Sequence, residues 1–348
     1  MSATQHMAVL GSLLNERKSF MDSATTIRIF ISVVLVAGFV FANATVMGYL
    51  ERKLAGHFQR RLGPMEVGWH GILQMPVDGI KLLGKRMLVP KQAEGLIFRL
   101  APVISLSPVL LPLMVIPFSP ALQVVDMKTG LIFVLAIEAF GTIAVFLAGW
   151  SSNNKYAMIG ALRSVAQNIA YEIPILLVAL SAALIAGSFS LQQIVLSQAT
   201  IWFIVLQPLG FLIYMVAGLS ECNRAPFDLP EAESELTAGY LTEYSGIAFS
   251  LFMIAEYTHM FIICCLATVL FLGGWQGPEL PWAEYSSAIW FLIKAYGLMF
   301  CMVWVRWTFP RVRYDQLMNF AWKYLIPFAL VNLFVTAFGV YIYEKLFS

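Results

Sequence analysis

The chain has 348 residues, of which 59% are hydrophobic and only 12% are charged, and its formal net charge is +2. Soluble domains average about 45–50% apolar and about 25% charged residues, so this composition excludes an ordinary soluble protein. It indicates an integral membrane protein with several spans. Because transmembrane barrels consist of short alternating strands rather than long apolar runs, the sequence predicts an all-α fold.

Apolar stretches of about the length that a transmembrane helix requires occur along the whole chain. Eight of them cover residues 27–50, 97–118, 130–150, 170–187, 201–219, 245–272, 286–308 and 324–343. No linker, internal repeat or low-complexity tract separates them. We therefore expect residues 1–348 to form a single polytopic membrane domain with about eight transmembrane helices.

Residues 66–85, between the first two spans, have the pattern of an amphipathic helix lying in the membrane interface. The apolar positions at helical spacing are Trp69, Ile72, Leu73, Val77, Ile80 and Leu83. The polar positions between them are His70, Gln74, Asp78, Lys81 and Lys85. Such a helix is usually an anchor, and it can also frame a lateral entry for a lipid-like substrate.

Lys and Arg are distributed unequally between the two sets of loops. The loops after the first, third, fifth and seventh spans carry 14 of them, whereas the loops after the second, fourth and sixth carry only Lys128. By the positive-inside rule the first set faces the cytoplasm, so we expect both termini on the outer side. Arg17 and Lys18 in the N-terminal tail argue weakly against this orientation.

An acidic cytoplasmic loop is predicted at residues 220–244. Its acids are Glu221, Asp228, Glu231, Glu233, Glu235 and Glu243, and Arg224 is the only base among them. Carboxylates gathered where apolar spans meet water are typical of membrane proteins that handle protons or cations. The alternative is helix capping, with Pro230 at the first position and Glu231 and Glu233 at the positive helix end. Capping explains only two of the acids, and the two interpretations are compatible.

Four acids fall inside the predicted spans or at their ends: Glu138, Glu172, Glu221 and Glu256. A carboxylate at the centre of a membrane helix costs roughly 2.5–3.5 kcal/mol on insertion scales, so these groups must be protonated, paired or hydrated. One alternative is structural pairing with Arg163, Lys294 or Arg306. We favour a hydrated proton path, because these bases are too few to neutralise all four acids.

The sequence predicts no redox centre, metal site or catalytic residue in this chain. Its four cysteines, Cys222, Cys264, Cys265 and Cys301, form no Cys-x-x-Cys pair, which argues against an iron–sulfur cluster or zinc site. Only His259 of the four histidines lies in a predicted span, so a haem held by two intramembrane histidines is excluded. No glycine-rich phosphate-binding motif is present.

Residues 221–236 read Glu-Cys-Asn-Arg-Ala-Pro-Phe-Asp-Leu-Pro-Glu-Ala-Glu-Ser-Glu-Leu, a string too particular to be chance. It resembles the signature of the H subunit of NADH–quinone oxidoreductase, the respiratory complex I component that mitochondria number as subunit 1. Further matches are Glu-Arg-Lys at 51–53, Gln-Arg-Arg-Leu-Gly-Pro at 59–64, Tyr-Glu-Ile-Pro at 171–174 and Ala-Glu-Tyr at 255–257. Cys222 and His259 depart from the family pattern, which has a small hydroxyl residue and a neutral amide there.

The resemblance implies roles for particular residues. The buried proton path would comprise Glu138, Glu172, Glu221 and Glu256. The quinone cavity and its coupling loop would comprise Arg52, Arg60, Arg61, Asp228, Glu231, Glu233 and Glu235. Quinone would be a substrate, whereas the groups that bond its head would belong to a partner protein of the complex.

The family also implies partners and a location. NADH, FMN and iron–sulfur clusters would reside on partner subunits, which would include peripheral quinone-module subunits and small and antiporter-like membrane subunits. Membrane lipid would surround the chain in the bacterial plasma (inner) membrane, and no nucleic acid is expected. Two other functions stay open: the homologous anchor of a membrane-bound hydrogenase or ferredoxin-driven complex, and a self-sufficient cation/proton antiporter.

Overall fold

The computed structural model describes residues 23–229, 236–278 and 283–347, and every regular element in these ranges is a helix. Seven helices in this part of the chain are long and apolar enough to cross a membrane. An eighth apolar helix, Pro208–Glu221, is shorter. The predicted all-α, polytopic membrane fold is therefore confirmed. The prediction of a single domain over residues 1–348 stays a prediction.

Several spans form one continuous helix each. They are α2 (Ser23–Phe58), α6 (Gly130–Ser151), α7 (Lys155–Ala186), α12 (Ile247–Phe271) and α13 (Ala283–Thr308). The observed α6 ends one residue after the predicted span, while α7 begins 15 residues before its predicted start at 170. Asn154 caps α7 by accepting a hydrogen bond from the Tyr156 N–H, and Gly187 ends it in the left-handed conformation.

Other predicted spans are interrupted. The second consists of α4 (Gly95–Ile104) and α5 (Ser107–Val115). The fifth consists of α9 (Phe203–Leu206) and α10 (Pro208–Glu221), since Gln207 leaves the helical conformation and Pro208 starts a new helix. At the C-terminal end, α14 (Tyr314–Phe320), a π-helical turn (Ala321–Leu325) and α15 (Ile326–Phe347) follow without a break. The small helix α8 (Leu191–Ser197) precedes α9.

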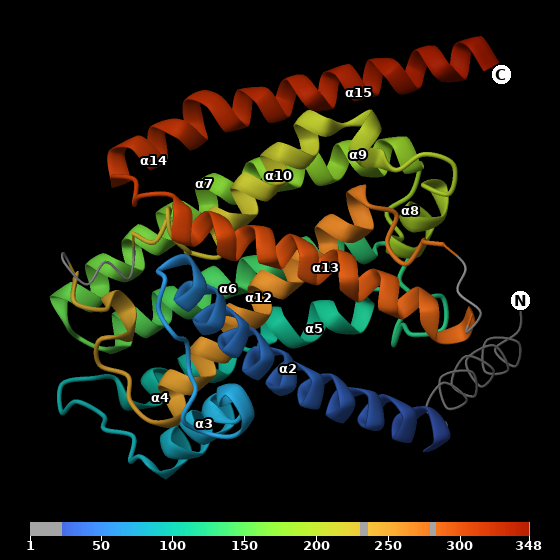
Figure 1. Ribbon diagram of the computed structural model, residues 1–348. Helices are drawn as coiled ribbons and strands as arrows, with labels where there is room; N and C mark the ends of the chain where they lie inside the picture. The colour runs from blue at the N-terminus through green and yellow to red at the C-terminus, as the bar shows by residue number, and fades with distance from the viewer. Residues whose placement is uncertain (1–22, 230–235, 279–282, 348) are drawn as a thin grey trace, which may run out of the picture.

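Helix α12 is the centre of the bundle (Figure 1). In its most apolar stretch 78% of the residues are buried, whereas the corresponding value for the α14–α15 span is 17%. Helices α2, α4, α5, α7, α10 and α13 all pack against α12. The α15 helix instead crosses the outside of the bundle over α7 and α10. Side chains on α12 are thus shielded from lipid by the rest of the molecule.

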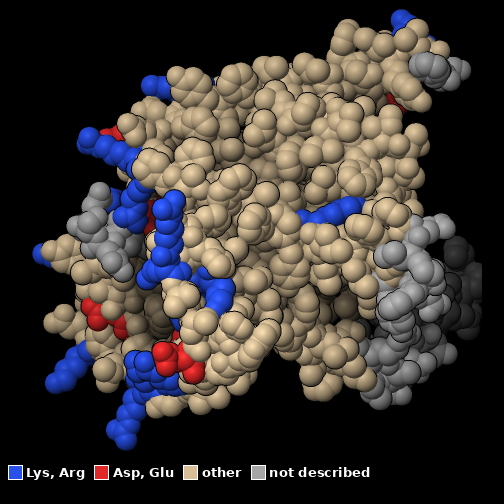
Figure 2. Space-filling view, in the orientation of Figure 1, with Lys and Arg blue, Asp and Glu red and all other residues tan. Residues whose placement is uncertain are grey.

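The amphipathic segment predicted at 66–85 contains a short turn, Trp69–Gly71, and helix α3 (Gln74–Gly84). No residue of α3 is buried, and Ile80 and Leu83 are 68% and 65% exposed. Lys and Arg gather at the end of the molecule where α2 ends and α14 begins (Figure 2). An exposed apolar face beside basic side chains is what an interfacial helix presents to a membrane.

Candidate functional site

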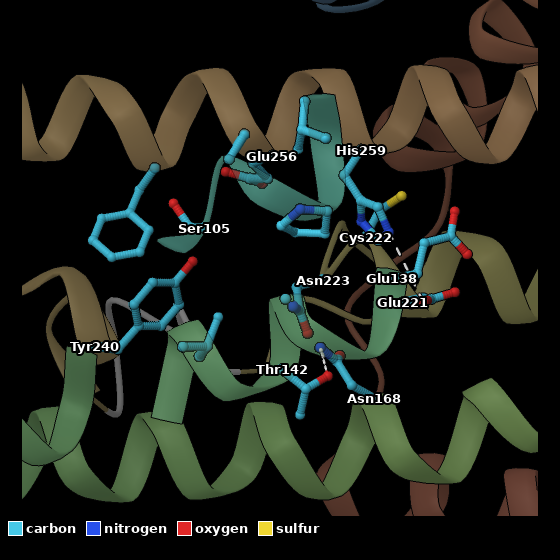
Figure 3. A pocket seen from close by; sticks show the side chains of 16 residues that line it. Ser105, Glu138, Thr142, Asn168, Glu221, Cys222, Asn223, Tyr240, Glu256 and His259 are labelled. Carbon is cyan, nitrogen blue, oxygen red and sulfur yellow. Dashed lines mark hydrogen bonds and ion pairs between the residues drawn. The ribbon is translucent and has the colours of Figure 1, made fainter. Parts of the chain in front are cut away.

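A cavity of about 80 Å³ lies beside α12, at the level where α10 ends (Figure 3). Its polar walls come from the C-terminal end of α4, from α6 and α7, from the turn after α10, from the turn η2 (Gly239–Leu241) and from α12. The polar residues that line it are Ser105, Glu138, Thr142, Asn168, Glu221, Cys222, Asn223, Tyr240, Glu256 and His259. We call this space the central cavity. A polar volume of this size admits several water molecules.

Three of the four predicted intramembrane acids line the central cavity: Glu138, Glu221 and Glu256. Glu138 and Glu221 are 5% and 6% exposed. Glu138 Oε1 and Glu221 Oε2 are buried without a hydrogen-bond partner among the described residues. An isolated buried carboxylate is costly, so carboxyl groups placed in this way must be protonated or contact water in the cavity.

The fourth acid, Glu172, lies on α7 and is half-buried, but it is not part of the cavity wall. Its helix packs against α6, which carries Glu138, and against α10, which ends at Glu221. Because α7 begins at Lys155, Glu172 lies in the middle of a helix rather than near its start. The structure therefore extends the group of acids from α12 and α10 across α6 to α7.

Glu256 differs from the other acids because it is paired with an arginine. Arg224, in the turn after α10, has its Nε 2.7 Å from Glu256 Oε1, and its guanidinium lies 4.6 Å from the ring centre of Tyr257. Arg224 Nη1 is also 3.7 Å from Glu51 Oε1, at the end of α2. Arg306 of α13 pairs with the same oxygen of Glu51. Two acids and two arginines from four segments thus form one network, of which only Arg306 is partly exposed.

Sequence reasoning did not assign Glu51 to the site, although it noted the Glu-Arg-Lys motif that contains it. The predicted first span stopped at residue 50, whereas α2 continues to Phe58 and carries Glu51 into the interior, where it is 4% exposed. A carboxylate directly after an apolar run was the available signal. Only the packing of α2 against α12 and α13 shows that it is buried.

A second cavity, of about 290 Å³, lies beside Glu51. Its wall consists of Glu51, Arg52, Ala55, Arg61, Leu62, Gly63, Pro64, Tyr257 and Trp307. We call it the outer cavity. Arg52 and Arg61, two of the residues predicted near a quinone, line it, whereas Arg60 lies in the adjoining turn and is exposed. Arg52 also pairs with Asp78 of α3 at 2.7 Å.

The chain after α2 folds back along the helix to form this wall. The Arg61 N–H donates to the carbonyl of Gly56 at 2.8 Å, and a Cβ on Gly56 would lie 2.8 Å from the Gly63 nitrogen. Glycine at position 56 therefore permits the close approach. Lys53 Nζ donates to the carbonyls of Pro64 and His70, which fixes the returning segment.

The acidic loop is described at residues 220–229 and 236–244, and the predicted site residues Glu231, Glu233 and Glu235 lie outside the described residues. Asp228 does not line either of the two cavities; its Oδ2 lies 3.0 Å from Arg311 Nη2. Gln167 Nε2 donates to the carbonyls of Ser220 and Phe227. The bonds from Gln167 attach the first half of the loop to α7, and the Asp228–Arg311 pair attaches it to the segment between α13 and α14.

The second half of the loop packs on α4 and α7. A Cβ on Gly160 would lie 2.7 Å from the Gly239 Cα, so α7 and η2 are in close contact. Tyr244 stacks on Phe98 with ring centres 4.1 Å apart, and burial raises the pKa of its hydroxyl to about 12. Asn154 Nδ2 donates to Glu243 Oε1 at 2.7 Å. The described part of the loop is thus built into the bundle.

The bases suggested as partners for the four acids have other contacts. Arg306 pairs with Glu51. Lys294 Nζ donates to the carbonyls of Leu272, Gly274 and Gln276 at 2.7, 3.0 and 2.5 Å, at the C-terminal end of α12. Arg163 lies over the ring of Tyr314. The arginine that pairs with one of the acids is Arg224, which had been considered only as a member of the acidic loop.

The fold and the site define an integral membrane protein whose interior contains several carboxyl groups that line two cavities. Residues 30–337 match the profile of the family described as NADH dehydrogenase. The chain belongs to this family. Within the described residues no three His, Cys, Asp or Glu side chains form a group that could hold a metal ion.

Similar proteins share one name, which identifies each as the H subunit of NADH-quinone oxidoreductase. The protein from Carboxydothermus hydrogenoformans is 44% identical over 332 residues, which cover 95% of both chains. The one from Anoxybacillus flavithermus is 46% identical over 319 residues, 90% of this chain and 95% of the relative. The one from Desulfotalea psychrophila is 45% identical over 327 residues, 90% and 97% of the two chains.

Proposed function

We propose that this chain is the membrane subunit of a proton-pumping NADH–quinone oxidoreductase, in which it forms part of the quinone cavity and couples quinone reduction to proton translocation. The observation that carries the proposal is a series of ionisable groups that extends from the outer cavity to the central cavity. It runs from the arginines of the outer cavity through Glu51, Arg224 and Glu256 to Glu221 and Glu138 in the central cavity. Glu172 extends the series into α7.

The outer cavity suits the head of a quinone. Its volume of about 290 Å³ is near the lower end of the range for small-molecule pockets, roughly 300–1,000 Å³. Tyr257, Trp307 and Leu62 supply an apolar wall, while Arg52 and Arg61 supply positive charge. Helix α3, whose Asp78 pairs with Arg52, presents an exposed apolar face along which a lipid-like tail can approach.

The wider assignments belong to the same proposal. Quinone is a substrate, and NADH, FMN and iron–sulfur clusters reside on partner subunits of the complex. The chain contacts peripheral quinone-module subunits, small membrane subunits and antiporter-like subunits in a bacterial plasma (inner) membrane, with both termini on the outer side. The relatives' shared name supports this function over a hydrogenase anchor or an independent antiporter.

The decisive experiment uses the complete complex in proteoliposomes. Glu221→Gln keeps the size and hydrogen-bonding capacity of the side chain but removes its exchangeable proton. Quinone reduction and proton pumping should both fall, while electron transfer from NADH to a hydrophilic acceptor, which needs no quinone, should be retained. A Glu221→Gln complex that reduces quinone and pumps protons at the normal rate would contradict the proposed proton path.

A further inference from the structure

The central cavity also contains two amide side chains that have no part in the series of ionisable groups. Asn168 lies on α7 and Asn223 lies in the turn after α10, and both side chains line the cavity (Figure 3). Asn168 is only 8% exposed. A buried amide is costly unless both its oxygen and its nitrogen have hydrogen-bond partners. The partners of these two amides therefore indicate what the cavity holds.

The nitrogen of each amide bonds to a hydroxyl group, whereas the oxygen has no partner. Asn168 Nδ2 donates to Thr142 Oγ1 of α6 at 3.4 Å, and Asn223 Nδ2 donates to Ser164 Oγ of α7 at 3.3 Å. Asn168 Oδ1 and Asn223 Oδ1 are buried without a hydrogen-bond partner among the described residues. The hydroxyl groups thus occupy the amide nitrogens and leave the amide oxygens without a donor.

The carboxyl groups of the cavity have the same deficit. Glu138 lies four residues before Thr142 on α6, so it projects from the helix face that also contacts Asn168. Glu138 Oε1 and Glu221 Oε2 are buried without a partner in the part of the chain that the structure describes. Two carboxyl oxygens and two amide oxygens around one cavity therefore all accept hydrogen bonds and all lack a donor. No carboxyl group donates directly to either amide oxygen.

Water is the donor that fits this arrangement. A water molecule has two O–H groups, so it can bridge an amide oxygen and a carboxyl oxygen. The cavity volume of about 80 Å³ exceeds the roughly 10–15 Å³ that one water molecule requires. We propose that Asn168 is a positioning residue, which together with Asn223 holds the water molecules through which protons pass between Glu221 and Glu138. This inference rests on the proposed function, because it specifies how protons cross the central cavity.

The transfer through water is a proton movement without any change of oxidation state. The O–H bond of protonated Glu221 breaks as an O–H bond forms at the water oxygen. One of the original O–H bonds of the water breaks as its proton passes to the Glu138 carboxylate, so the water is regenerated. An amide oxygen accepts a hydrogen bond but is not itself an ionisable group. Asn168 can therefore orient the water without retaining the proton.

The test uses the complete complex in proteoliposomes with Asn168→Leu, which keeps the approximate size of the side chain but removes the amide. Asn223 is a less suitable position, because its φ of 50° is left-handed and Leu would be strained there. Quinone reduction and pumping should fall by about tenfold, while electron transfer from NADH to a hydrophilic acceptor should be retained. Exchange of H₂O for D₂O should slow Asn168→Leu more than the unmodified complex, because proton transfer then limits the rate.

The matched control is Asn332→Leu. Asn332 lies on α15, is 7% exposed and donates to Ser181 Oγ at 3.1 Å, and it lines neither cavity. Its replacement removes a buried amide of the same kind, so it measures the structural cost of the substitution. Asn332→Leu should lower stability without raising the isotope effect. Asn168→Ser, which restores a small oxygen acceptor, should recover most of the pumping that Asn168→Leu loses.

A density map of the unmodified complex, at a resolution that shows ordered water, makes the test independent of whether the variants assemble. A water molecule should lie within about 3.0 Å of Asn168 Oδ1. A cavity without water at this oxygen, or a protein group that donates to it, would overturn the inference. So would an Asn168→Leu complex that pumps at the normal rate with a normal isotope effect.

The same set of proteoliposomes separates this inference from the function on which it rests. If Glu221→Gln stops pumping while Asn168→Leu pumps normally, the proton path stands without the asparagine. If Glu221→Gln also pumps normally, the proposed function falls, and the role of Asn168 falls with it. Loss of pumping in Glu221→Gln and Asn168→Leu, with recovery in Asn168→Ser and an unchanged isotope effect in Asn332→Leu, supports both.

Discussion

Arg224 Nε lies 2.7 Å from Glu256 Oε1, and the two side chains are only 8% and 11% exposed. The pair stands where the outer and central cavities approach each other: Tyr257, under the guanidinium, lines the outer cavity, and Glu256 lines the central one. A buried ion pair gains little net stability over apolar packing, but its loss leaves an uncompensated charge. The position of the Arg224–Glu256 pair between the two cavities is therefore more informative about function than its net contribution to stability.

Replacing Arg224 by Ala should destabilise the protein, because Glu256 would lose its partner and Glu51 would keep only Arg306. Breaking a buried pair costs about 3–5 kcal/mol. The midpoint of thermal aggregation of the purified complex should fall accordingly. Arg313→Ala is the matched control: Arg313 pairs with Asp315 at 80% and 65% exposure, where a pair contributes at most about 1 kcal/mol.

A double variant shows whether the unpaired charge of Glu256 causes the loss of stability in Arg224→Ala. Arg224→Ala together with Glu256→Gln removes both partners, so it should be more stable than Arg224→Ala alone. If the double variant is as unstable as the single one, Arg224 stabilises the fold by packing on Tyr257 rather than by compensating Glu256.

Helix α3 should affect access of long-tailed quinone. Ile72 precedes the helix and is 46% exposed. Its replacement by Trp would add bulk to the apolar face and so obstruct the approach of a lipid-like tail, without adding charge. Turnover should fall more with a long-tailed quinone than with a short, water-soluble analogue. Phe334→Trp on α15, at 69% exposure, is the control for a bulky change on a lipid-facing surface. Equal losses of turnover with both quinones would mean that α3 serves only as a membrane anchor.

The orientation of the chain can be checked by cysteine labelling from each side of the membrane. Gln59 and Leu122 are both exposed. Gln59 follows the first predicted span and Leu122 follows the second, so the predicted topology places them on opposite sides of the membrane. After replacement of the exposed Cys301 by Ala, Gln59→Cys should react from the cytoplasmic side and Leu122→Cys from the outer side. Labelling of Gln59→Cys from outside would reverse the predicted topology.

Composition and apolar periodicity were sufficient to predict most of the spans. The α6 prediction of 130–150 differs from Gly130–Ser151 by one residue, because a long apolar run has no other stable conformation in a membrane. The break at Gln207 was not predicted, since Pro208 stands within a continuous apolar run and hydropathy alone does not show where such a run changes direction. The extension of α7 to Lys155 was missed because Arg163, Ser164, Gln167 and Asn168 interrupt the apolar run before residue 170.

In the candidate site, too, some features were predictable from the sequence and others were not. Glu138, Glu221 and Glu256 were predicted from their cost inside a membrane, and the structure brings them to one cavity. Their partners were not predictable, because pairing depends on how separate helices pack. Arg306 and Lys294 have the right depth but contact Glu51 and the end of α12. Nothing in the sequence specified Arg224, rather than these bases, as the partner of Glu256.

The final prediction separates proton transfer from structural pairing by comparing two acids in the same cavity. Glu138 has an oxygen without a hydrogen-bond partner among the described residues, whereas Glu256 is paired with Arg224. Gln at either position removes the exchangeable proton. Glu138→Gln should therefore leave thermal stability unchanged or raise it, since a neutral amide is cheaper to bury, while quinone reduction and pumping fall by more than about tenfold.

Glu256→Gln should lower both stability and pumping, because it also leaves Arg224 beside a neutral partner. Glu172→Gln should behave like Glu138→Gln if α7 belongs to the same path. The control is Asp315→Asn at 65% exposure, which changes charge in the same way outside the cavities. Should Glu138→Gln and Glu172→Gln assemble and pump at normal rates while Glu256→Gln is merely unstable, the carboxyl groups would be structural, and protons would have to cross the protein elsewhere.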